Sequence, residues 1–214
     1  MWKTVLWACV FFVVQPRSMA QVASSADSRG AAPDATMAGP QRSEFVPMTQ
    51  RERLRHYFKS AFGVEGLVLS TTGAGVSQWM NTPSEWGQGA EGYARRFGNS
   101  YAQHMIRSTL TYGTSSVLHE DNRYIPSDQS GFAPRLKYAI TSSFLARRDD
   151  GSRHLSISRL SSYLATAFIS REWQPHSTIG PQNAMLSFST AMGTAVGVRV
   201  AREFFPTVFR RHRD

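Results

Sequence analysis

Apolar side chains recur along the chain at intervals of three and four residues, which is the period of a helix that buries one face. No stretch of useful length alternates between apolar and polar positions as a half-buried β-strand does. The pattern therefore predicts an all-α fold, a compact bundle of about five or six helices with small-residue helix–helix packing. The predicted helical segments cover residues 49–63, 64–79, 84–118, 135–146, 156–169 and 181–205.

Several of these segments begin with residues that favour helix starts. Thr49 lies three positions before Glu52, which is the spacing of a capping box. Pro83 is expected at the first position of the long helix, where a proline has no backbone hydrogen bond to lose. Either Ser156 or Ser158 is expected to open the helix that runs to residue 169.

Four of the predicted helices have an apolar stripe that we expect to face the core. Side chains four positions apart lie on the same side of a helix, so each stripe would pack against a neighbouring helix. The expected stripes are Leu54, Tyr57, Phe58 and Phe62; Phe97, Tyr101, Met105, Ser108 and Tyr112; Leu136, Ile140 and Phe144; and Leu160, Leu164, Ala167 and Phe168.

A second periodic feature is a ladder of small residues at every fourth position. Such a face lets two helix axes approach closely, either in a tightly packed soluble bundle or in a bilayer. We expect these faces to pack helix against helix. The ladders are Gly66, Ser70 and Ala74; Ala94, Gly98 and Ala102; Ser158, Ser162, Thr166 and Ser170; and Ser189, Gly193, Gly197 and Ala201.

The segments outside the predicted bundle differ in composition. Residues 1–20 combine a positive start, a short apolar run and a small-x-small end, which is typical of a secretory signal peptide. Residues 21–47 are rich in Ala, Ser, Gly, Pro and Asp and predict a disordered linker. The helical domain is expected over 48–209, followed by a basic tail at 210–214.

Charge and cysteine content narrow the possible partners. The net charge of +9 favours anionic partners, and the only cysteine, Cys9, falls inside the predicted signal peptide. An exported protein rarely meets nucleic acid, so no nucleic-acid partner is expected. Anionic lipid or an envelope polymer is the expected partner, self-association through the small-residue faces is a further possibility, and no cofactor is expected.

Polar residues gather in two loops, at 119–124 and 147–154. His119, Glu120, Asp121, Asp149 and His154 are residue types that bind metal ions, so the loops are candidates for a metal site or a small active centre. The chain contains no HExxH or G-x-S-x-G motif to support such chemistry. An enzyme or metal-binding module is therefore the alternative to a non-enzymatic role.

The same loops also favour a structural interpretation. Asp121, Arg123, Tyr124, Arg147 and Asp149 can form a clasp, in which paired acids and arginines tie the long helix to its neighbours. An arginine beside an aromatic residue is also suited to hold a carboxylate or a phosphate, so the same five residues are candidates for anion binding. We expect the clasp.

The motifs of these loops resemble those of a family of exported bacterial proteins. Its members carry an E/Q-D-P-R-Y-F loop, then an R-x-D-x-G turn, then a helix that ends in I-S-x-x-Y-Y-P. The matching residues are Asp121, Arg123 and Tyr124; Arg147, Asp149 and Gly151; and Ala167, Ile169, Ser170 and Pro175. Asn122, Ile125 and Trp173-Gln174 depart from the pattern. The family has no assigned activity, so the resemblance implies export and a shared fold unit over about 85–205.

The relation of the chain to a membrane has two interpretations. Residues 180–198 are uncharged and long enough to span a bilayer, but they include Pro181, Gln182 and Asn183. Peripheral attachment through amphipathic faces and the basic tail is therefore expected, with integral insertion as the alternative. The sequence thus predicts an exported, non-enzymatic helical protein of the cell envelope, peripheral to a membrane or a wall polymer.

Overall fold

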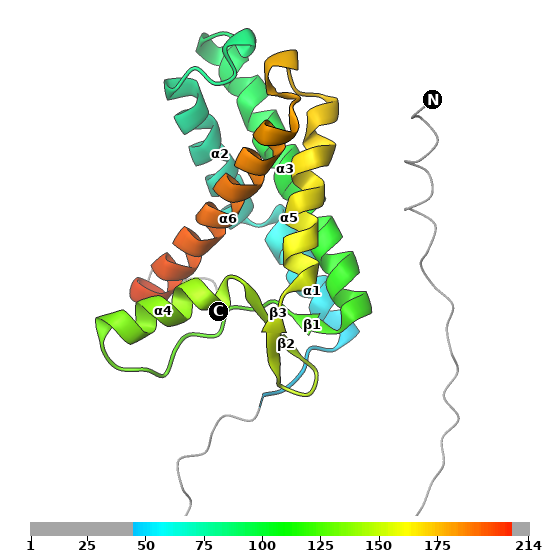
Figure 1. The fold of residues 1–214 in the computed structure, drawn as a ribbon, viewed down its shortest axis with the longest axis vertical. Helices are drawn as coiled ribbons and strands as arrows, with labels where there is room; N and C mark the ends of the chain where they lie inside the picture. The colour runs from blue at the N-terminus through cyan, green and yellow to red at the C-terminus, as the bar shows by residue number, and fades with distance from the viewer. Residues whose placement is uncertain (1–44, 207–214) are drawn as a thin grey trace, which may run out of the picture. The chain divides into compact units, whose positions relative to one another are not determined.

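The computed structural model describes residues 45–206; the predicted signal peptide (1–20), most of the predicted linker (21–47) and the predicted basic tail (210–214) lie outside the described residues. Within 45–206 the chain forms six α-helices, three short 3-10 helices and one small sheet (Figure 1). The helices are α1 (Gln50–Phe62), α2 (Val64–Trp79), α3 (Gly89–Leu118), α4 (Phe132–Ser142), α5 (Ile157–Ile169) and α6 (Pro181–Phe204). The predicted all-α class is therefore confirmed.

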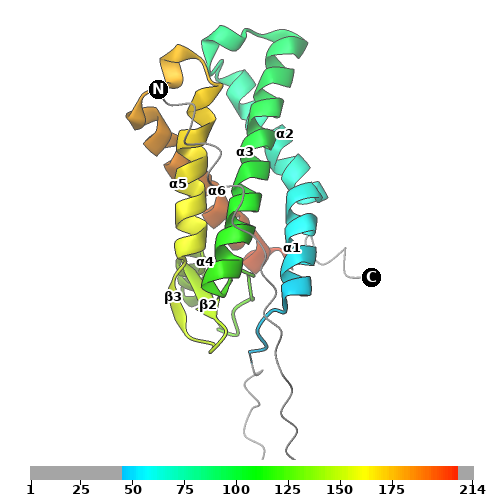
Figure 2. The same cartoon turned by 90° about the vertical axis from the view of Figure 1, so that its right-hand side faces the viewer.

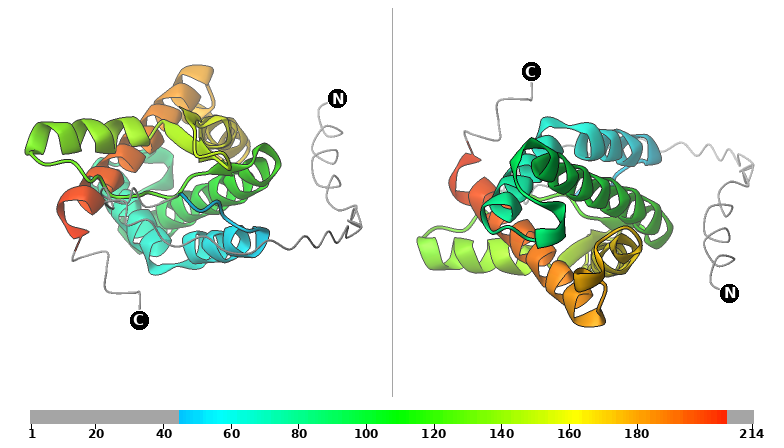
Figure 3. Two further views of the ribbon diagram at one scale, coloured as in Figure 1. Left: turned by 90° about the horizontal axis from the view of Figure 1, so that it is seen from below. Right: turned by 90° about the horizontal axis from the view of Figure 1, so that it is seen from above.

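The long helix α3 packs against α1, α2 and α5. α2 runs antiparallel to one side of α3, α5 packs along another side, and α6 returns beside α5 (Figures 1 and 2). α1 lies along the C-terminal half of α3, where the rings of Tyr57 and Tyr112 stack with centroids 5.0 Å apart. The α2–α3 and α5–α6 turns lie at one end of these helices, and α4 and the sheet lie at the other (Figure 3).

The predicted helix starts are confirmed for α1, α5 and α6. The Glu52 N–H donates to Thr49 Oγ1 at 3.3 Å, and Glu52 Oε2 accepts from the Thr49 N–H at 2.8 Å, which completes the capping box. Ser156 is the residue that caps α5, because its hydroxyl accepts a hydrogen bond from the Arg159 N–H. α6 begins at Pro181.

The prediction that Pro83 begins the long helix is wrong. Pro83 precedes the 3-10 turn η1 (Ser84–Trp86), and α3 starts only at Gly89. Gly87 and Gly89 have φ angles of 68° and 80°, a left-handed backbone that glycine adopts without a steric penalty. A Cβ at Gly92 would lie 2.4 Å from the Gly87 carbonyl oxygen, so this glycine-rich stretch forms a tight turn against the helix start.

A small antiparallel sheet forms where the sequence pattern shows no strands. It consists of β1 (Glu120–Asp121), β2 (Leu145–Arg148) and β3 (Arg153–Leu155), in the order β1-β2-β3. Strands of this length are too short to show an alternating pattern. β1 directly follows α3, so the sheet holds the end of the long helix against the β2–β3 hairpin.

The predicted helix over 135–146 is wrong at its C-terminal end. α4 ends at Ser142, and the chain then turns into β2. The hydroxyls of Ser142 and Ser143 donate to the Ala139 carbonyl at 2.8 and 3.2 Å. They occupy the acceptor that another helical hydrogen bond would use, and such local competition by serine favours a helix end.

The predicted burial of the apolar stripes is wrong for seven of their fourteen large side chains, and the other seven are only half-buried. The side chains of the expected stripes that are more than a third exposed are Leu54, Phe58, Phe62, Ile140, Phe144, Leu164 and Phe168. Within 45–206, the buried apolar residues are mostly alanines: Ala61, Ala74, Ala139, Ala146, Ala167 and Ala184, together with Met192. The fully buried apolar positions therefore hold mainly small residues, and half of the large stripe residues point outward.

The small-residue ladders of α2 and α5 explain this reversal. Every member of the α5 ladder is at most 2% exposed, and the α2 ladder is also buried. Ser162 Oγ lies 3.4 Å from Thr114 Oγ1 of α3, and a Cβ at Gly66 would lie 2.4 Å from His104 Nε2 of α3. Helices that approach this closely have no space for Leu or Phe between them, so the larger side chains lie on the outer faces.

The other two ladders do not pack as predicted. Ala94 and Gly98 of α3 and Ser189, Gly193 and Gly197 of α6 are exposed, and Ala102 and Ala201 are half-buried. A Cβ at Gly98, Gly193 or Gly197 would meet nothing within 4 Å among the described residues. The α3 ladder instead lines a shallow hollow of about 380 Å³ beside Trp86 and Trp173. Within the described chain, these two faces therefore have no helical partner.

The contact between α3 and α5 can be tested by introducing leucine separately at two adjacent positions of α5. Ser162→Leu places a large side chain in the close contact with Thr114 and should lower the free energy of unfolding by about 2 kcal/mol, the usual cost of overpacking. Ser161→Leu places the same side chain on the exposed face of α5 and should change it by less than about 0.5 kcal/mol. Denaturant unfolding in detergent measures both, and equal effects would contradict the inward orientation of the ladder.

Candidate functional site

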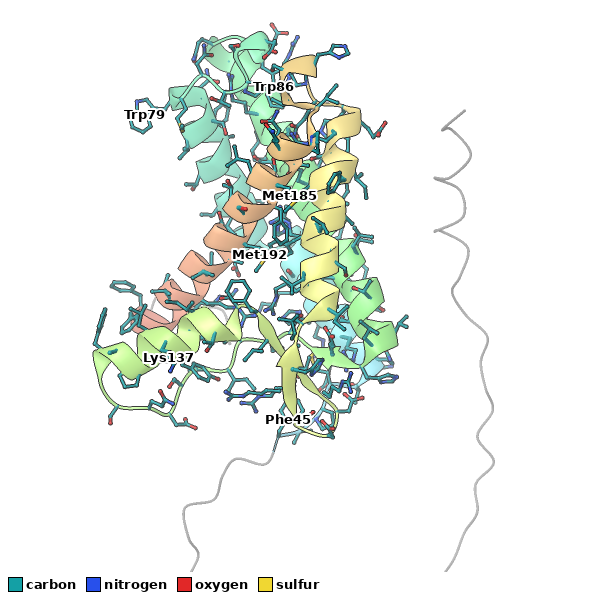
Figure 4. The ribbon with its side chains drawn as sticks, in the orientation of Figure 1. Phe45, Trp79, Trp86, Lys137, Met185 and Met192 are labelled. Carbon is teal, nitrogen blue, oxygen red and sulfur yellow. The ribbon has the colours of Figure 1, made fainter. Side chains whose placement is uncertain are left out.

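Six of the eight charged side chains that are buried among residues 45–206 gather where α5 begins, beside the sheet and the C-terminal end of α6. We call this cluster the polar junction; its buried members are Arg53, Glu120, Asp121, Arg159, Arg199 and Glu203. Figure 4 shows this end of the molecule around Phe45 and Lys137, far from Trp79 and Trp86 at the other end. A buried charge is tolerated only when hydrogen bonds or an opposite charge compensate it, so the partners of each member are informative.

Glu120 places a carboxylate at the N-terminus of α5. Its Oε1 accepts from the Ile157 N–H at 3.1 Å, and its Oε2 accepts from the N–H and hydroxyl of Ser158 at 3.0 and 2.5 Å. The Ser156 hydroxyl also donates to Oε2 at 3.3 Å, and His154 Nε2 lies 3.2 Å from Oε1. The first N–H groups of a helix have no partner inside the helix and carry partial positive charge, so a buried carboxylate is well placed here.

Two opposing effects act on the pKa of Glu120. Burial raises it, but the hydrogen bonds from Ser158, His154 and Ile157 stabilise the ionised carboxylate more strongly and bring the pKa below its ordinary value of 4.5. Glu120 is therefore ionised at neutral pH. Its role is to join β1, the β2–β3 hairpin and α5.

Arg53 connects this arrangement to α1. Its Nη1 donates to the Glu120 carbonyl at 2.5 Å and to the Ser115 carbonyl at 3.3 Å, and its Nη2 pairs with Asp149 Oδ1 at 3.1 Å. The other oxygen of Asp149 lies 3.0 Å from His119 Nδ1. Asp149 therefore lies between α1 and the end of α3, and its partner arginine comes from α1, which sequence reasoning missed.

Asp121 and Arg123 form the predicted pair, but only within their own loop. Arg123 Nη2 lies 2.6 Å from Asp121 Oδ2, and Arg123 Nε donates to both carboxylate oxygens. Arg123 also donates to the Val46 carbonyl at 3.1 Å. Arg147 was expected to join this pair; it lies opposite Asp121 in the sheet, yet its guanidinium lies over the Phe45 ring, with Cζ 5.3 Å from the centroid.

Tyr124 connects the loop to α6 and does not act together with Arg123. Its hydroxyl donates to Glu203 Oε2, and burial together with this bond raises the pKa of the Tyr124 hydroxyl, which therefore stays protonated. Arg135 Nε of α4 donates to Glu203 Oε1 at 2.8 Å, and the Ser127 N–H donates to Oε2 at 3.2 Å. Glu203 thus holds α4, α6 and the loop together.

Arg159 and Arg199 are two buried cations that share acceptors. Both donate to the Asn122 carbonyl, at 2.9 and 3.1 Å, and both donate to the Ser142 carbonyl, at 3.3 and 2.6 Å. Among residues 45–206, neither forms an ion pair with a carboxylate. Sequence reasoning missed both. Arg159 is the only charged residue of α5, and Arg199 is the first charged residue after the uncharged stretch 181–198. A charge isolated in this way is a detectable signal of a buried partner.

The proposed metal ligands divide into separate pairs. Glu120 faces His154, Asp149 faces His119, and Asp121 is engaged by Arg123. In the part of the chain that the structure describes, no group of three His, Cys, Asp or Glu side chains is placed to hold one metal ion. The arrangement of these five residues is that of a structural junction.

Comparisons with known proteins add no relative: no family model, curated protein or solved structure matches the chain. The geometry of the described residues therefore carries the functional argument.

The importance of the Glu120 carboxylate can be tested by removing its charge. Glu120→Gln leaves several donors with a weaker acceptor in a buried position and should lower the free energy of unfolding by about 3 kcal/mol. Glu91→Gln is the matched control, because Glu91 pairs only with Arg95 on the exposed face of α3; it should cost less than about 0.5 kcal/mol. Chemical unfolding followed by circular dichroism measures both, and a small effect of Glu120→Gln would contradict its assigned role.

The lowered pKa of Glu120 also predicts an acid dependence of stability. Because the folded chain holds this carboxyl ionised to a lower pH than the unfolded chain does, the stabilisation is complete above the unfolded value of 4.5. It is lost as the pH falls through the lower folded value. Unfolding measured from about pH 6 to about pH 3 should therefore show a smaller loss of stability in Glu120→Gln than in the parent protein. Parallel curves for the two proteins would refute this assignment.

Proposed function

We propose that this protein is an exported, non-enzymatic component of the cell envelope that attaches to a membrane through the outer faces of α2, α5 and α6. The observation that carries the proposal is the reversed burial of α2 and α5: the small and polar residues of their ladders face inward, and several of their large apolar residues face outward. A water-soluble fold gains most of its stability by burying large apolar side chains. A protein in contact with acyl chains has no need to do so, and its helices pack through small residues.

The outer faces of these helices have almost no charge. α2 has no charged residue after Glu65, the only charged residue of α5 is the buried Arg159, and α6 has none from 181 to 198. Large apolar side chains exposed on the three helices include Leu67, Val68, Val76, Leu164, Phe168, Met185 and Leu186. Soluble monomers rarely present such faces on several helices at once, so these faces favour contact with lipid.

α6 has the strongest individual signal. Among the described residues, it is the one helix long and apolar enough to cross a membrane by length and composition. A core helix of a soluble protein can have the same composition, but such a helix is mostly buried. Only 17% of the apolar window of α6 is buried, which favours a lipid environment. The exposed ladder of Ser189, Gly193 and Gly197 would also allow a second copy to pack against α6 in the bilayer.

The two ends of the helices differ in a way that suits a membrane interface. Trp79, which is 86% exposed, and Trp86 lie at the end with the α2–α3 and α5–α6 turns (Figure 4). Trp173 lines the same hollow as Trp86, and tryptophan is enriched at membrane–water boundaries. The opposite end carries Arg123, Arg147 and Arg153, and such a group of cations suits anionic head groups. Between these ends lie the uncharged faces of α2, α5 and α6.

Membrane fractionation of cells that express the full chain tests this proposal. We expect the protein in the membrane fraction, resistant to washing with concentrated salt; resistance to alkaline carbonate as well would indicate insertion, and release by carbonate would indicate peripheral attachment. Recovery of the protein wholly in the soluble fraction would contradict the proposal.

A lysine introduced on the outer face of α6 provides a second test of the proposal. Leu186→Lys places a cation on the exposed apolar face of α6, which should cost about 2 kcal/mol in contact with lipid and shift a large share of the protein out of the membrane fraction. Val117→Lys, at an exposed position near the polar end of α3, should leave the distribution unchanged. Identical fractionation of the two variants would argue against contact between α6 and acyl chains.

A further inference from the structure

A cavity of about 30 Å³ lies between the β2–β3 hairpin, α4 and the loop after β1, beside the polar junction. Four arginines line it, Arg123, Arg147, Arg153 and Arg199, against a single carboxylate, that of Asp121. Hydroxyl-bearing residues, Tyr138, Thr141 and Ser142, complete the polar part of the lining. The lining therefore has an excess of positive charge.

The one carboxylate in the lining is already engaged. Three hydrogen bonds from the Arg123 guanidinium reach the Asp121 oxygens, and the Arg123 N–H adds a fourth at 2.9 Å. This pair is neutral as a unit, so Asp121 contributes little attraction for the remaining arginines.

Arg147 and Arg153 have guanidinium groups with no acceptor in the described structure. Within residues 45–206 neither side chain donates a hydrogen bond or forms an ion pair; Arg147 lies over the Phe45 ring and Arg153 lies over the Tyr138 ring, at 5.3 and 5.1 Å. The two residues are direct partners in the β2–β3 register. Like charges opposite one another on neighbouring strands repel, so this arrangement is unfavourable unless an anion lies between or beside them.

Arg199 of α6 adds a third cation without an acid partner to the lining of the cavity. It is 8% exposed, and among residues 45–206 its hydrogen bonds go to the neutral carbonyls of Asn122 and Ser142, which it shares with the buried Arg159. Two cations buried side by side without a carboxylate are costly in a protein interior. A bound anion would offset that cost as well as the repulsion between Arg147 and Arg153.

We propose that this cavity binds a phosphate group, with Arg147 and Arg153 as its direct ligands and Arg199 as a buried positive charge behind it. Guanidinium groups present paired N–H donors that match the oxygens of a phosphate, and a tetrahedral anion offers enough oxygens for more than one arginine. The phosphate comes either from the head group of an anionic lipid or from free inorganic phosphate. Only the lipid source depends on the membrane attachment proposed above.

Calorimetric titration of the full chain in detergent with inorganic phosphate, at ionic strength held constant with chloride, tests the site. We expect saturable binding and a higher melting temperature in phosphate, because a ligand that binds the folded state stabilises it. The double variant R147Q/R153Q should weaken phosphate binding by at least about tenfold. Arg148→Gln is the matched control: Arg148 adjoins Arg147 in the same strand but does not line the cavity, so binding should be unchanged.

A conservative double variant separates the effect of the paired guanidinium donors from the effect of positive charge. R147K/R153K keeps both charges but removes the paired donors, and it should bind phosphate with an affinity between those of the parent and R147Q/R153Q. Circular dichroism confirms that each variant is folded before titration. Equal phosphate binding by the parent protein and R147Q/R153Q, or no effect of phosphate on the parent, would exclude free phosphate as the ligand. The proposal is overturned if vesicles that contain phosphatidylglycerol also fail to distinguish the two proteins.

Vesicles distinguish the two sources of phosphate. Binding is compared on vesicles of phosphatidylcholine alone and of phosphatidylcholine with phosphatidylglycerol. Tighter binding to the mixed vesicles that R147Q/R153Q loses and Arg148→Gln keeps assigns a lipid head group, while a response to inorganic phosphate alone assigns the free anion. The site is refuted when neither phosphate nor phosphatidylglycerol distinguishes the parent from R147Q/R153Q. Binding to phosphatidylcholine by all variants alike reports on membrane attachment separately.

Discussion

The buried carboxylate of Glu120 at the first turn of α5 is the interaction on which the polar end of this protein depends. It accepts hydrogen bonds from the backbone of Ile157 and Ser158 and from the hydroxyls of Ser156 and Ser158. The N–H groups of Ile157 and Ser158 lie in the first turn of α5 and have no acceptor inside the helix. Because Glu120 directly follows the end of α3, this one side chain fixes α3, the sheet and α5 relative to each other.

The same use of buried charge continues to α1, α4 and α6. Arg53 brings α1 to the carbonyl of Glu120, and Glu203 brings α6 to Arg135 of α4 and to Tyr124. Hydrogen-bonded charges thus do at this end what a large apolar core does in most soluble domains. The large apolar side chains are left for the outer faces, which is the arrangement that supports the proposed attachment to lipid. Arg147, Arg153 and Arg199, which have no acid partner among residues 45–206, lie at the same polar end, where a head group would meet them.

Local signals in the sequence predicted much of the secondary structure. Thr49 with Glu52, Ser156 and Pro181 mark real helix starts because each acts on backbone groups within a few residues. The failures have equally local causes. The glycines after Pro83 delay α3, and the hydroxyls of Ser142 and Ser143 end α4 early. Of the polar loops, the Asp121–Arg123 pair could be expected, whereas the partners of Glu120, Asp149 and Tyr124 lie on elements far away in sequence.

By itself, the sequence determined that the described chain is helical, where several helices begin, and which two faces each helix has. Only the tertiary structure decided which face is buried. Periodicity separates large apolar residues from small ones on α2 and α5, but it carries no information about the solvent or about the distance between helix axes. Once α2 and α5 approach α3 as closely as Gly66 and Ser162 allow, volume excludes Leu and Phe from the contact. The buried charges follow the same rule, because Glu120 is placed by donors that lie more than thirty residues further along the chain.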